Sequence, residues 1–386
     1  MKYKNYKLEE LATIKYGKNQ KKVISDNGHI PIYGTGGLMG YATEALYDKP
    51  SVLIGRKGTI EKVRYVTHPF WTVDTLFYTI IQDNIVLPHY LYYLMSLLDL
   101  KKFNEGTTIP SLRTETLNRI EFNVPELEYQ SKVLSILEPI EEKIDTNNLI
   151  NKNLLQQIQL LCRSWLIDYA PFGYERPATW SVVPLSTIAD FVSGYSYKGA
   201  ELVESDIAMA TIKNFDRKGG FKLDGYKEIQ PSAKLKPEQH AELFDTLVAH
   251  TDLTQNAEVI GNAEPVLSLS GYRDIVFSMD VVKVLPNEGV SKFLLAALLQ
   301  DGRFKAHALG YVNGTTVLHL SKKALPEFEL PLPSDLEELA PLADTVEFMY
   351  RQIANNIDES TQLAKLRDSL LPRLMSGELN ISAIDL

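Results

Sequence analysis

The chain has 386 residues, of which 45% are hydrophobic and 23% are charged. This length and composition favour two or three globular domains and exclude a chain that is disordered over most of its length. The single cysteine, Cys162, excludes an intrachain disulfide, and no apolar run of about 18 residues predicts a membrane span. We therefore expect a reduced protein of the cytoplasm.

Charge is distributed unevenly along the chain. The formal net charge of −9 by itself disfavours nucleic acid as a partner. Residues 1–64, however, contain ten lysines and two arginines against six acids, a local charge of +6. Acids are concentrated in two expected helices, over residues 138–145 and 335–347. An acidic scaffold with locally basic parts is compatible with DNA binding, without requiring it.

Two globular parts of mixed secondary structure are expected. In the first part, β-rich runs cover residues 51–54, 61–66 and 77–81, and a helical pattern covers 88–100. In the second part, strands are expected over 246–249 and 275–284, followed by a helix over 290–300. Because strands and helices do not alternate regularly, the fold class is predicted to be α+β.

A long helical pattern follows each globular part and carries an apolar seam with heptad spacing. The first seam has Asn147 and Asn151 at its centre, and the second has Asn356 and Ser360. Polar seam residues fix the register of paired helices, so we expect a long antiparallel coiled coil paired centre to centre. The alternative is that each helix packs on its own globular part. The residues expected to pair the helices are Val133, Leu137, Ile140, Ile144, Asn147, Leu154, Ile158, Leu342, Val346, Met349, Ile353, Asn356, Leu363 and Leu370.

Two prolines bear on the helix starts. Pro341 is expected in an early helical turn, where proline is tolerated. Pro139 lies deeper and predicts a kink or a later start of the first helix.

The sequence also contains an internal repeat. An apolar pattern over residues 8–17 returns over 185–194. The pattern of residues 106–125 returns over 314–333, and both of these segments end in proline. Between these landmarks the two copies differ, and the second is longer. Two copies with shared ends and different middles are expected of a protein that makes two different recognitions with one architecture. An old duplication whose middles drifted gives the same pattern.

The repeat divides the chain into two copies of one plan, related as an internal pseudo-two-fold repeat. The predicted parts are a first globular domain (1–128), a first long helix (129–169), a linker (170–177), a second globular domain (178–333), a second long helix (334–378) and a tail (379–386).

Catalytic signatures are absent from the sequence. It has no P-loop, no Asn-Pro-Pro or Asp-Pro-Pro run of the kind shared by amino-methyltransferases, and no histidine and cysteine spacing for a metal. No cofactor and no metal are therefore predicted, and Cys162 is expected to be a buried structural thiol. The glycine-rich run over residues 34–40 lacks the spacing of a dinucleotide-binding loop, although a nucleotide-using enzyme built on it stays an alternative.

Polar and basic residues in glycine-containing loops are the candidate DNA contacts. Arginine and lysine can bind base edges and phosphates, and threonine turns offer hydroxyl and N–H groups to phosphates. In the first copy the candidates are Arg56, Lys57, Thr59, Lys62, Arg64, Thr107, Thr108, Ser111 and Arg113. In the second copy they are Lys213, Asn214, Arg217, Lys218, Thr251, Gln255, Thr315, Thr316, His319, Ser321 and Lys322. For any single one of them, a plain surface role is the alternative.

Four stretches resemble recurrent motifs of one family, the specificity subunit of Type I restriction–modification systems. They are residues 55–60, 106–112, 130–150 and 366–379, the last of which reads LRDSLLPRLMSGEL and is the most specific. The order of globular domain, long helix, second globular domain and second long helix is also similar to that family over essentially the whole chain.

The resemblance implies a non-catalytic, DNA-binding subunit of a bacterial defence system. Each target-recognition domain would recognise one half of a bipartite site in double-stranded DNA. The paired helices would hold the domains and dock modification subunits, two of them by expectation, which carry the S-adenosylmethionine-dependent DNA methylation activity; a restriction subunit joins them. The alternative is an interaction scaffold of the same architecture that does not recognise DNA.

Overall fold

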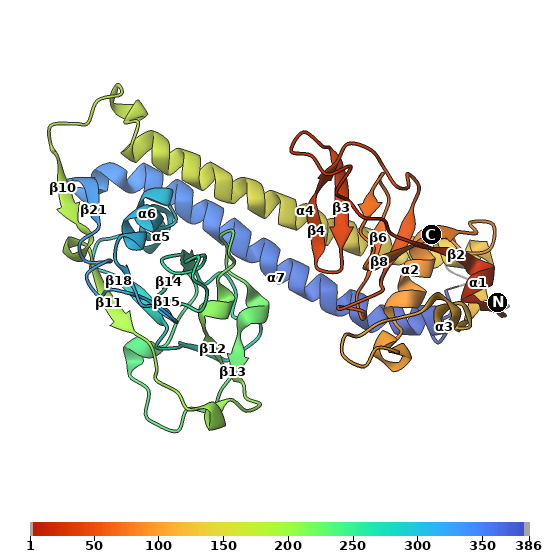
Figure 1. Cartoon of the computed structure of the whole chain (residues 1–386). Coiled ribbons are helices and arrows are strands. Elements are labelled where there is room, and N and C mark those ends of the chain that lie inside the picture. Colours follow the sequence, from red (N-terminus) through yellow and green to blue (C-terminus); the bar gives the residue numbers. More distant parts are fainter. Residues whose placement is uncertain (1–2, 382–386) are drawn as a thin grey trace. The chain divides into compact units, whose positions relative to one another are not determined.

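The computed structural model describes residues 3–381. Contacts divide the chain into two compact units, and each long helix contributes one portion to each unit (Figure 1). The first unit contains the chain up to Glu142 and again from Leu363, and the second unit is Lys143–Gln362. Within residues 3–381, no helix combines the length and the apolar character needed to cross a bilayer.

The first unit contains three small sheets. Strand β1 (Tyr3–Lys7) pairs with β9 (Glu121–Pro125). A four-stranded sheet has the order β2-β8-β5-β6, formed by β2 (Ala12–Tyr16), β5 (Ser51–Gly55), β6 (Val63–Val66) and β8 (Leu76–Ile81). A third has the order β4-β3-β7, formed by β3 (Ile30–Gly34), β4 (Gly37–Ala42) and β7 (Trp71–Thr72). The helices are α1 (Leu8–Leu11), α2 (Pro88–Ser96), α3 (Thr114–Asn118) and the 3-10 helix η1 (Leu100–Phe103).

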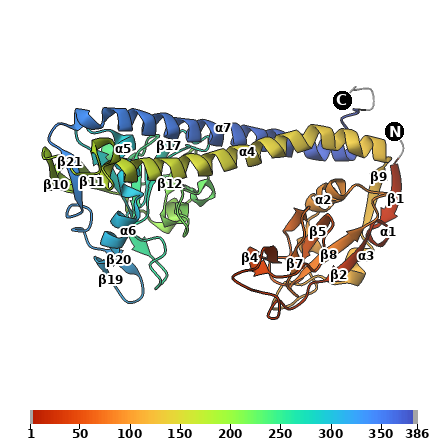
Figure 2. The same cartoon turned by 90° about the horizontal axis from the view of Figure 1, so that it is seen from above.

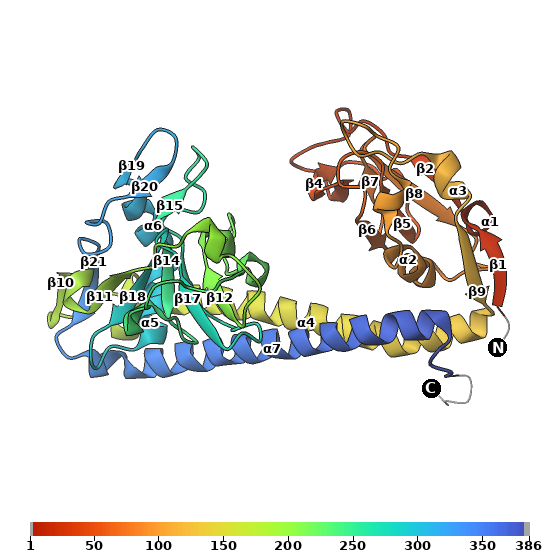
Figure 3. The same cartoon turned by 90° about the horizontal axis from the view of Figure 1, so that it is seen from below.

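The second unit repeats this plan with more strands (Figure 3). Its sheets have the orders β10-β21, β11-β18-β14-β16, β13-β12-β17 and β15-β20-β19. The strands are β10 (Trp180–Pro184), β11 (Ala189–Ser193), β12 (Ile207–Ala210), β13 (Lys227–Glu228), β14 (Thr246–Ala249), β15 (Thr251–Asp252), β16 (Ala263–Pro265), β17 (Asp274–Phe277), β18 (Val281–Pro286), β19 (Val312–Asn313), β20 (Leu318–Leu320) and β21 (Glu329–Pro333). The helices are α5 (Lys292–Leu299) and α6 (Gly302–Leu309). The 3-10 helices are η2 (Ala170–Phe172), η3 (Leu185–Thr187), η4 (Gly199–Glu201), η5 (Ile212–Asn214), η6 (Leu223–Gly225), η7 (Pro237–Gln239) and η8 (Leu336–Leu339).

Strand pairing confirms the α+β class and the internal repeat. In the first unit β1 pairs with β9, with Tyr3 opposite Pro125, and in the second β10 pairs with β21, with Trp180 opposite Pro333. The order β2-β8-β5 likewise returns as β11-β18-β14. The two copies therefore share a framework of strands as well as a pattern of apolar residues.

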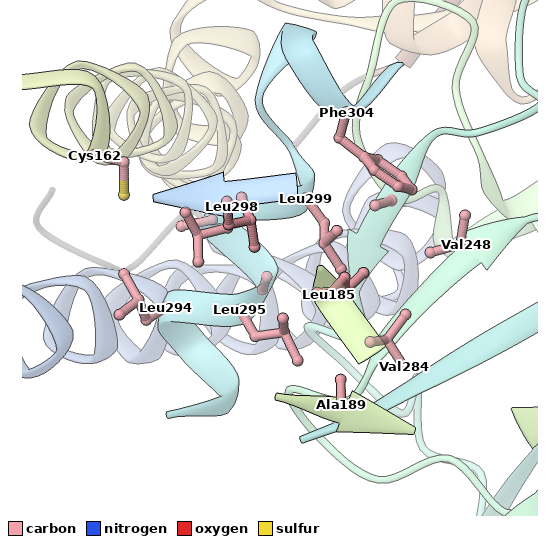
Figure 4. Packing of buried hydrophobic residues seen from close by; sticks show 14 of the residues in the cluster. Cys162, Leu185, Ala189, Val248, Val284, Leu294, Leu295, Leu298, Leu299 and Phe304 are labelled. Atoms are coloured by element: carbon pink, nitrogen blue, oxygen red, sulfur yellow. The ribbon is translucent and has the colours of Figure 1, made fainter. Parts of the chain in front are cut away.

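Each unit has its own apolar core. In the first, α2 and the four-stranded sheet enclose a cluster that includes Phe77 and Tyr90. In the second, the apolar helix α5 packs on β14 and β18, and Figure 4 shows its leucines in one core with Cys162 of the long helix. Cys162 is buried as expected, and burial raises the pKa of its thiol to about 12.

The long helices are α4 (Leu127–Leu166) and α7 (Ala340–Ser376), and within each unit their portions run antiparallel (Figure 2). In the first unit Val133 and Leu137 share a cluster with Leu374. In the second unit Ile158 shares a cluster with Val346, and that cluster also includes α5. The helices therefore pair with each other and also pack on the globular part of each unit.

Burial of the expected pairing residues follows this arrangement. Among the apolar ones, Val133, Leu137, Ile158, Leu342, Val346 and Ile353 are buried, while Ile140, Ile144, Leu154, Met349, Leu363 and Leu370 are half-buried. The buried face of α7 in the second unit is wider than a heptad seam, since Tyr350 and Ala354 are buried as well. The buried face is wider because α7 contacts the globular part as well as α4.

Some expected boundaries were wrong. Pro139 lies inside α4, which starts at Leu127, so the later helix start is excluded; Pro139 is exposed, and water can satisfy the carbonyl that its ring leaves unpaired. Pro341 is the second residue of α7, as expected. The expected strand over residues 275–284 is two strands, because the chain turns at residues 278–280 between β17 and β18. Of the expected tail, residues 382–386 lie outside the described part of the chain.

The polar centres of the two helices meet in the second unit. The Asn147 side chain, which is fully buried, donates hydrogen bonds to Glu359 Oε2 (2.8 Å), to Ser360 Oγ (3.2 Å) and to the Asn356 carbonyl (3.4 Å). The Asn356 amide donates to Asn151 Oδ1 (2.8 Å). These contacts occur only in one register, so the seam amides fix the alignment of the helix portions.

We predict that Asn147→Ala destabilises the chain by about 1–2 kcal/mol, because Glu359, Ser360 and the buried Asn356 lose a hydrogen-bond donor. Urea unfolding followed by circular dichroism measures the change. Asn148→Ala, at the exposed neighbouring position on α4, is the matched control and should change stability by less than about 0.5 kcal/mol. Equal midpoints for the two variants would contradict a register role for Asn147.

Candidate nucleic-acid interface

In the first unit, two polar segments that are far apart in sequence form one surface. The loop after β5 forms a β-bridge through Lys57 to Ser111, and the Gly58 N–H donates to the Pro110 carbonyl (2.9 Å). This contact joins the loop of residues 56–59 to the threonine turn of residues 106–108. Lys57, Thr107 and Thr108 are exposed there, so hydroxyl groups and an ammonium group share the surface.

Arginine and lysine candidates of the first unit differ in how free they are. The Arg56 guanidinium donates to the Asp74 carbonyl (2.7 Å) and lies over the Tyr16 ring at 5.1 Å, so part of it serves the fold. Arg113 pairs with Glu105 at 3.1 Å, and Thr59 is half-buried. Lys62 is exposed just before β6, and Arg64 is half-buried within that strand.

The second unit joins its corresponding segments in the same way. Thr251 of β15 pairs with His319 of β20, and the Gln255 amide donates to the Thr315 carbonyl (2.8 Å). The threonine turn of residues 314–316 is thus held against the loop after β14. Thr315, Thr316, His319 and Lys322 are exposed, and Ser321 is half-buried.

Other candidates of the second unit do not fit a direct contact. Asn214 is fully buried, and its side chain accepts from the Thr211 N–H (2.8 Å) and donates to the Lys222 carbonyl (2.8 Å), so it shapes its own loop. Thr251 is 4% exposed and contributes through its strand pairing. The amide of Gln255 is bound to the threonine turn, which makes it a positioning residue.

The basic loop of residues 213–218 is held by contacts of its own. Arg217 pairs with Glu258 at 3.2 Å, and the Asn262 amide donates to the Asp216 carbonyl (3.0 Å). Lys213 and Lys218 are exposed. These contacts attach the loop to the segment of residues 258–262 that precedes β16.

His250, which directly follows β14 and precedes Thr251, was not among the predicted DNA contacts. Burial lowers the pKa of His250, and the nearby His319 and Lys322 lower it further, so its imidazole is mainly neutral near pH 7. Strand register was the missing signal, because it alone shows that His250 takes the position of Arg56.

Both threonine turns require their glycine. A Cβ on Gly106 would lie 1.9 Å from the Ile109 carbonyl oxygen, and one on Gly314 would lie 2.2 Å from the Val317 carbonyl oxygen. Gly314 also has a φ of +113°, which side chains rarely adopt. The repeated glycine is therefore explained by the close approach of the backbone within the turn.

We predict that Gly106→Ala displaces the first threonine turn and destabilises the chain by about 1–3 kcal/mol, because a backbone carbonyl must move. Gly36→Ala is the matched control, since a Cβ there meets nothing within 4 Å. Thermal unfolding compares the two variants. A Gly106→Ala protein as stable as Gly36→Ala would show that the turn relaxes without cost.

An imidazole with two carboxylate partners attaches α2 to α4 in the first unit. His89 lies stacked between Tyr65 and Tyr93, with ring centroids at 4.5 and 4.6 Å. Its Nδ1 is 2.9 Å from Glu138 and its Nε2 is 3.1 Å from Glu141. Burial alone lowers the pKa of His89, but the hydrogen bonds to Glu141 and Glu138 outweigh burial and raise it above 6.5.

This raised pKa predicts a pH-dependent stability. Its contribution is fully present below the ordinary imidazole pKa of about 6.5 and is lost as pH rises through the raised value. Unfolding midpoints of wild type and His89→Gln, measured from pH 5.5 to 8.5, should therefore converge at the alkaline end. The exposed His29→Gln variant serves as control. A difference between wild type and His89→Gln that is constant with pH would contradict the ion-pair role.

The glycine-rich run of residues 34–40 forms the hairpin between β3 and β4. A dinucleotide-binding loop would instead connect a strand to a helix N-terminus. The glycine-rich run therefore does not have the structure of a nucleotide-binding loop, on which the nucleotide-enzyme alternative depended.

Comparisons with known proteins find similarity to one kind of protein. Residues 1–157 match the family model described as the Type I restriction modification DNA specificity domain. The HindI specificity subunit of a Type I restriction enzyme from Haemophilus influenzae is 23% identical, over 80% of this chain and 81% of the relative. The MjaIX specificity subunit from Methanocaldococcus jannaschii is 24% identical, over 88% and 80%. A crystal structure of the S subunit of a Type-I restriction-modification system from M. genitalium has a TM-score of 0.57 at 16% identity, covering 97% of this chain and 96% of that one, and shows that the fold is shared.

Residues 1–157 therefore match a DNA specificity domain, and the fold of the chain is shared with a solved S subunit. Over 77–88% of its length the chain is similar to specificity subunits of Type I restriction enzymes.

Proposed function

We propose that this chain is the sequence-specific DNA-binding subunit of a Type I system and recognises a bipartite target. Residues 1–128 would recognise one half-site and residues 178–333 the other. The observation that carries the proposal is the shared backbone pairing of loop and threonine turn in both units, with different side chains on it. One framework with two sets of side chains supports two different recognitions.

The proposed partners of this chain are the other subunits of a Type I restriction–modification system. Modification subunits, two of them, and a restriction subunit would assemble with this chain, with the long helices as their docking elements. S-adenosylmethionine would bind the modification subunit, and this chain would supply specificity without catalysis. The similarity to specificity subunits of Type I restriction enzymes supports this assignment.

Co-expression with its modification subunit, followed by methylome sequencing, tests the proposed function. The expected result is adenine methylation at one bipartite sequence that disappears when this chain is omitted. Methylation that does not depend on this chain, or DNA binding by the complex without sequence preference, would favour the alternative of an interaction scaffold.

We predict that Lys57→Ala weakens DNA binding of the assembled complex and reduces the slope of log affinity against log salt concentration by about 0.9, because one phosphate contact is lost. The effect should be nearly uniform over target sequences. Lys49→Ala removes an equally exposed lysine of the first unit outside the joined loops and is the control. An unchanged salt slope for Lys57→Ala would place Lys57 outside the interface.

A further inference from the structure

The two units differ in side-chain size at one corner beside the candidate interface. Arg56 and His250 occupy equivalent backbone positions. The Arg56 N–H donates to the Thr75 carbonyl (2.8 Å), and its carbonyl accepts from the Leu112 N–H (2.9 Å). The His250 N–H donates to the Asp280 carbonyl (2.8 Å), and its carbonyl accepts from the Leu320 N–H (2.9 Å).

Strand register extends the equivalence to the neighbouring strands. Tyr16 lies opposite Phe77 in the first unit, and Ser193 lies opposite Val282 in the second. At all three positions of this corner the second unit therefore has the smaller side chain: serine for tyrosine, valine for phenylalanine and histidine for arginine.

In the first unit large side chains fill the corner. The Tyr16 and Phe77 rings are in edge contact at 5.0 Å, and the Arg56 guanidinium covers Tyr16. In the second unit the same corner is a cavity of about 570 Å³. Phe191, Val282 and Leu325 provide its apolar wall, and Ser193, His250, Asp280, His319 and Lys322 provide polar groups.

The polar groups form a mixed set. His319 and Lys322 are exposed hydrogen-bond donors, and His250 offers one donor and one acceptor when neutral. Asp280 supplies a carboxylate acceptor. A phosphate would be repelled by this carboxylate, and it gains nothing from an apolar wall. The major-groove edge of a G·C pair, by contrast, presents two acceptors on guanine, N7 and O6, and one donor on cytosine, N4.

We propose that this cavity is the base-recognition pocket of the second unit and binds the major-groove edge of a G·C pair, with guanine facing His319 and Lys322 and cytosine facing Asp280. The inference rests on the proposed DNA recognition and names the site that makes the second half-site different from the first. In the first unit the same corner holds the Tyr16, Phe77 and Arg56 side chains, so its half-site is recognised by a different surface.

The test fills the pocket. Ser193→Tyr places in the second unit the side chain that fills the corner of the first. Wild type and variant, each assembled with modification subunits, select from a DNA library that is random in both half-sites. We expect one half-site to lose its guanine preference at one position by about tenfold or more, while the other half-site is unchanged. Asp190→Tyr adds the same side chain at an exposed position of the same strand and should select the wild-type sequence.

Three results would overturn the pocket: unchanged selection by Ser193→Tyr, an equal loss of affinity for all sequences, which indicates a phosphate contact, or a wild-type half-site without a G·C pair at the affected position. If Ser193→Tyr fails to fold, His319→Ala and Lys322→Ala decide the question, since both residues are exposed and should relax the same base pair. Wild-type complex that selects no sequence at all would instead refute the proposed function.

Discussion

Hydrogen bonds between a strand near the start of each globular part and the strand that precedes the following long helix hold this protein together. β1 pairs with β9 in the first unit, and β10 pairs with β21 in the second. Because these pairings join the two ends of each globular part, the segment between them can vary in length and sequence without releasing the connection to the helix. The longer middle of the second unit shows this tolerance, since its sheet β13-β12-β17 keeps the order and strand directions of β4-β3-β7 in the first unit.

Within each globular part, a second backbone pairing joins a loop to a threonine turn. The loop after β5 or β14 is joined by backbone hydrogen bonds to a threonine turn that a glycine makes possible. Backbone pairing does not depend on the side chains that it displays. The same backbone geometry can therefore carry arginine in one unit and histidine in the other, as at Arg56 and His250. Two recognition domains of one architecture need this freedom.

Polar groups at buried places restrict the long helices more sharply than apolar ones do. A leucine seam tolerates a shift by one heptad, whereas Asn147 keeps its three hydrogen bonds only in one alignment. In the first unit, His89 adds a charged contact between α2 and α4. The Asn147 hydrogen bonds and the His89 contacts each form in only one alignment of the packed helices. A substitution at either place should therefore alter the alignment of the helices more than the packing of the apolar core.

The sequence alone determined the repeat, the fold class, the two long helices and their polar centres. Heptad spacing and matched apolar positions are local patterns, and the energetic reason for them, burial of one face, can be recognised without coordinates. The threonine turns were likewise identified from Gly106 and Gly314, since a glycine kept at matching places marks a backbone constraint.

Only the tertiary structure decided which polar residues share a surface. Asn214 resembled a contact residue by type but is buried, because its amide satisfies the backbone of its own loop. His250 was missed, and the corner formed with Ser193 and Val282 was invisible, because those residues come from strands separated by long stretches of chain. Which distant strands lie side by side depends on long-range backbone hydrogen bonds, and the residues of one strand alone do not specify its partner.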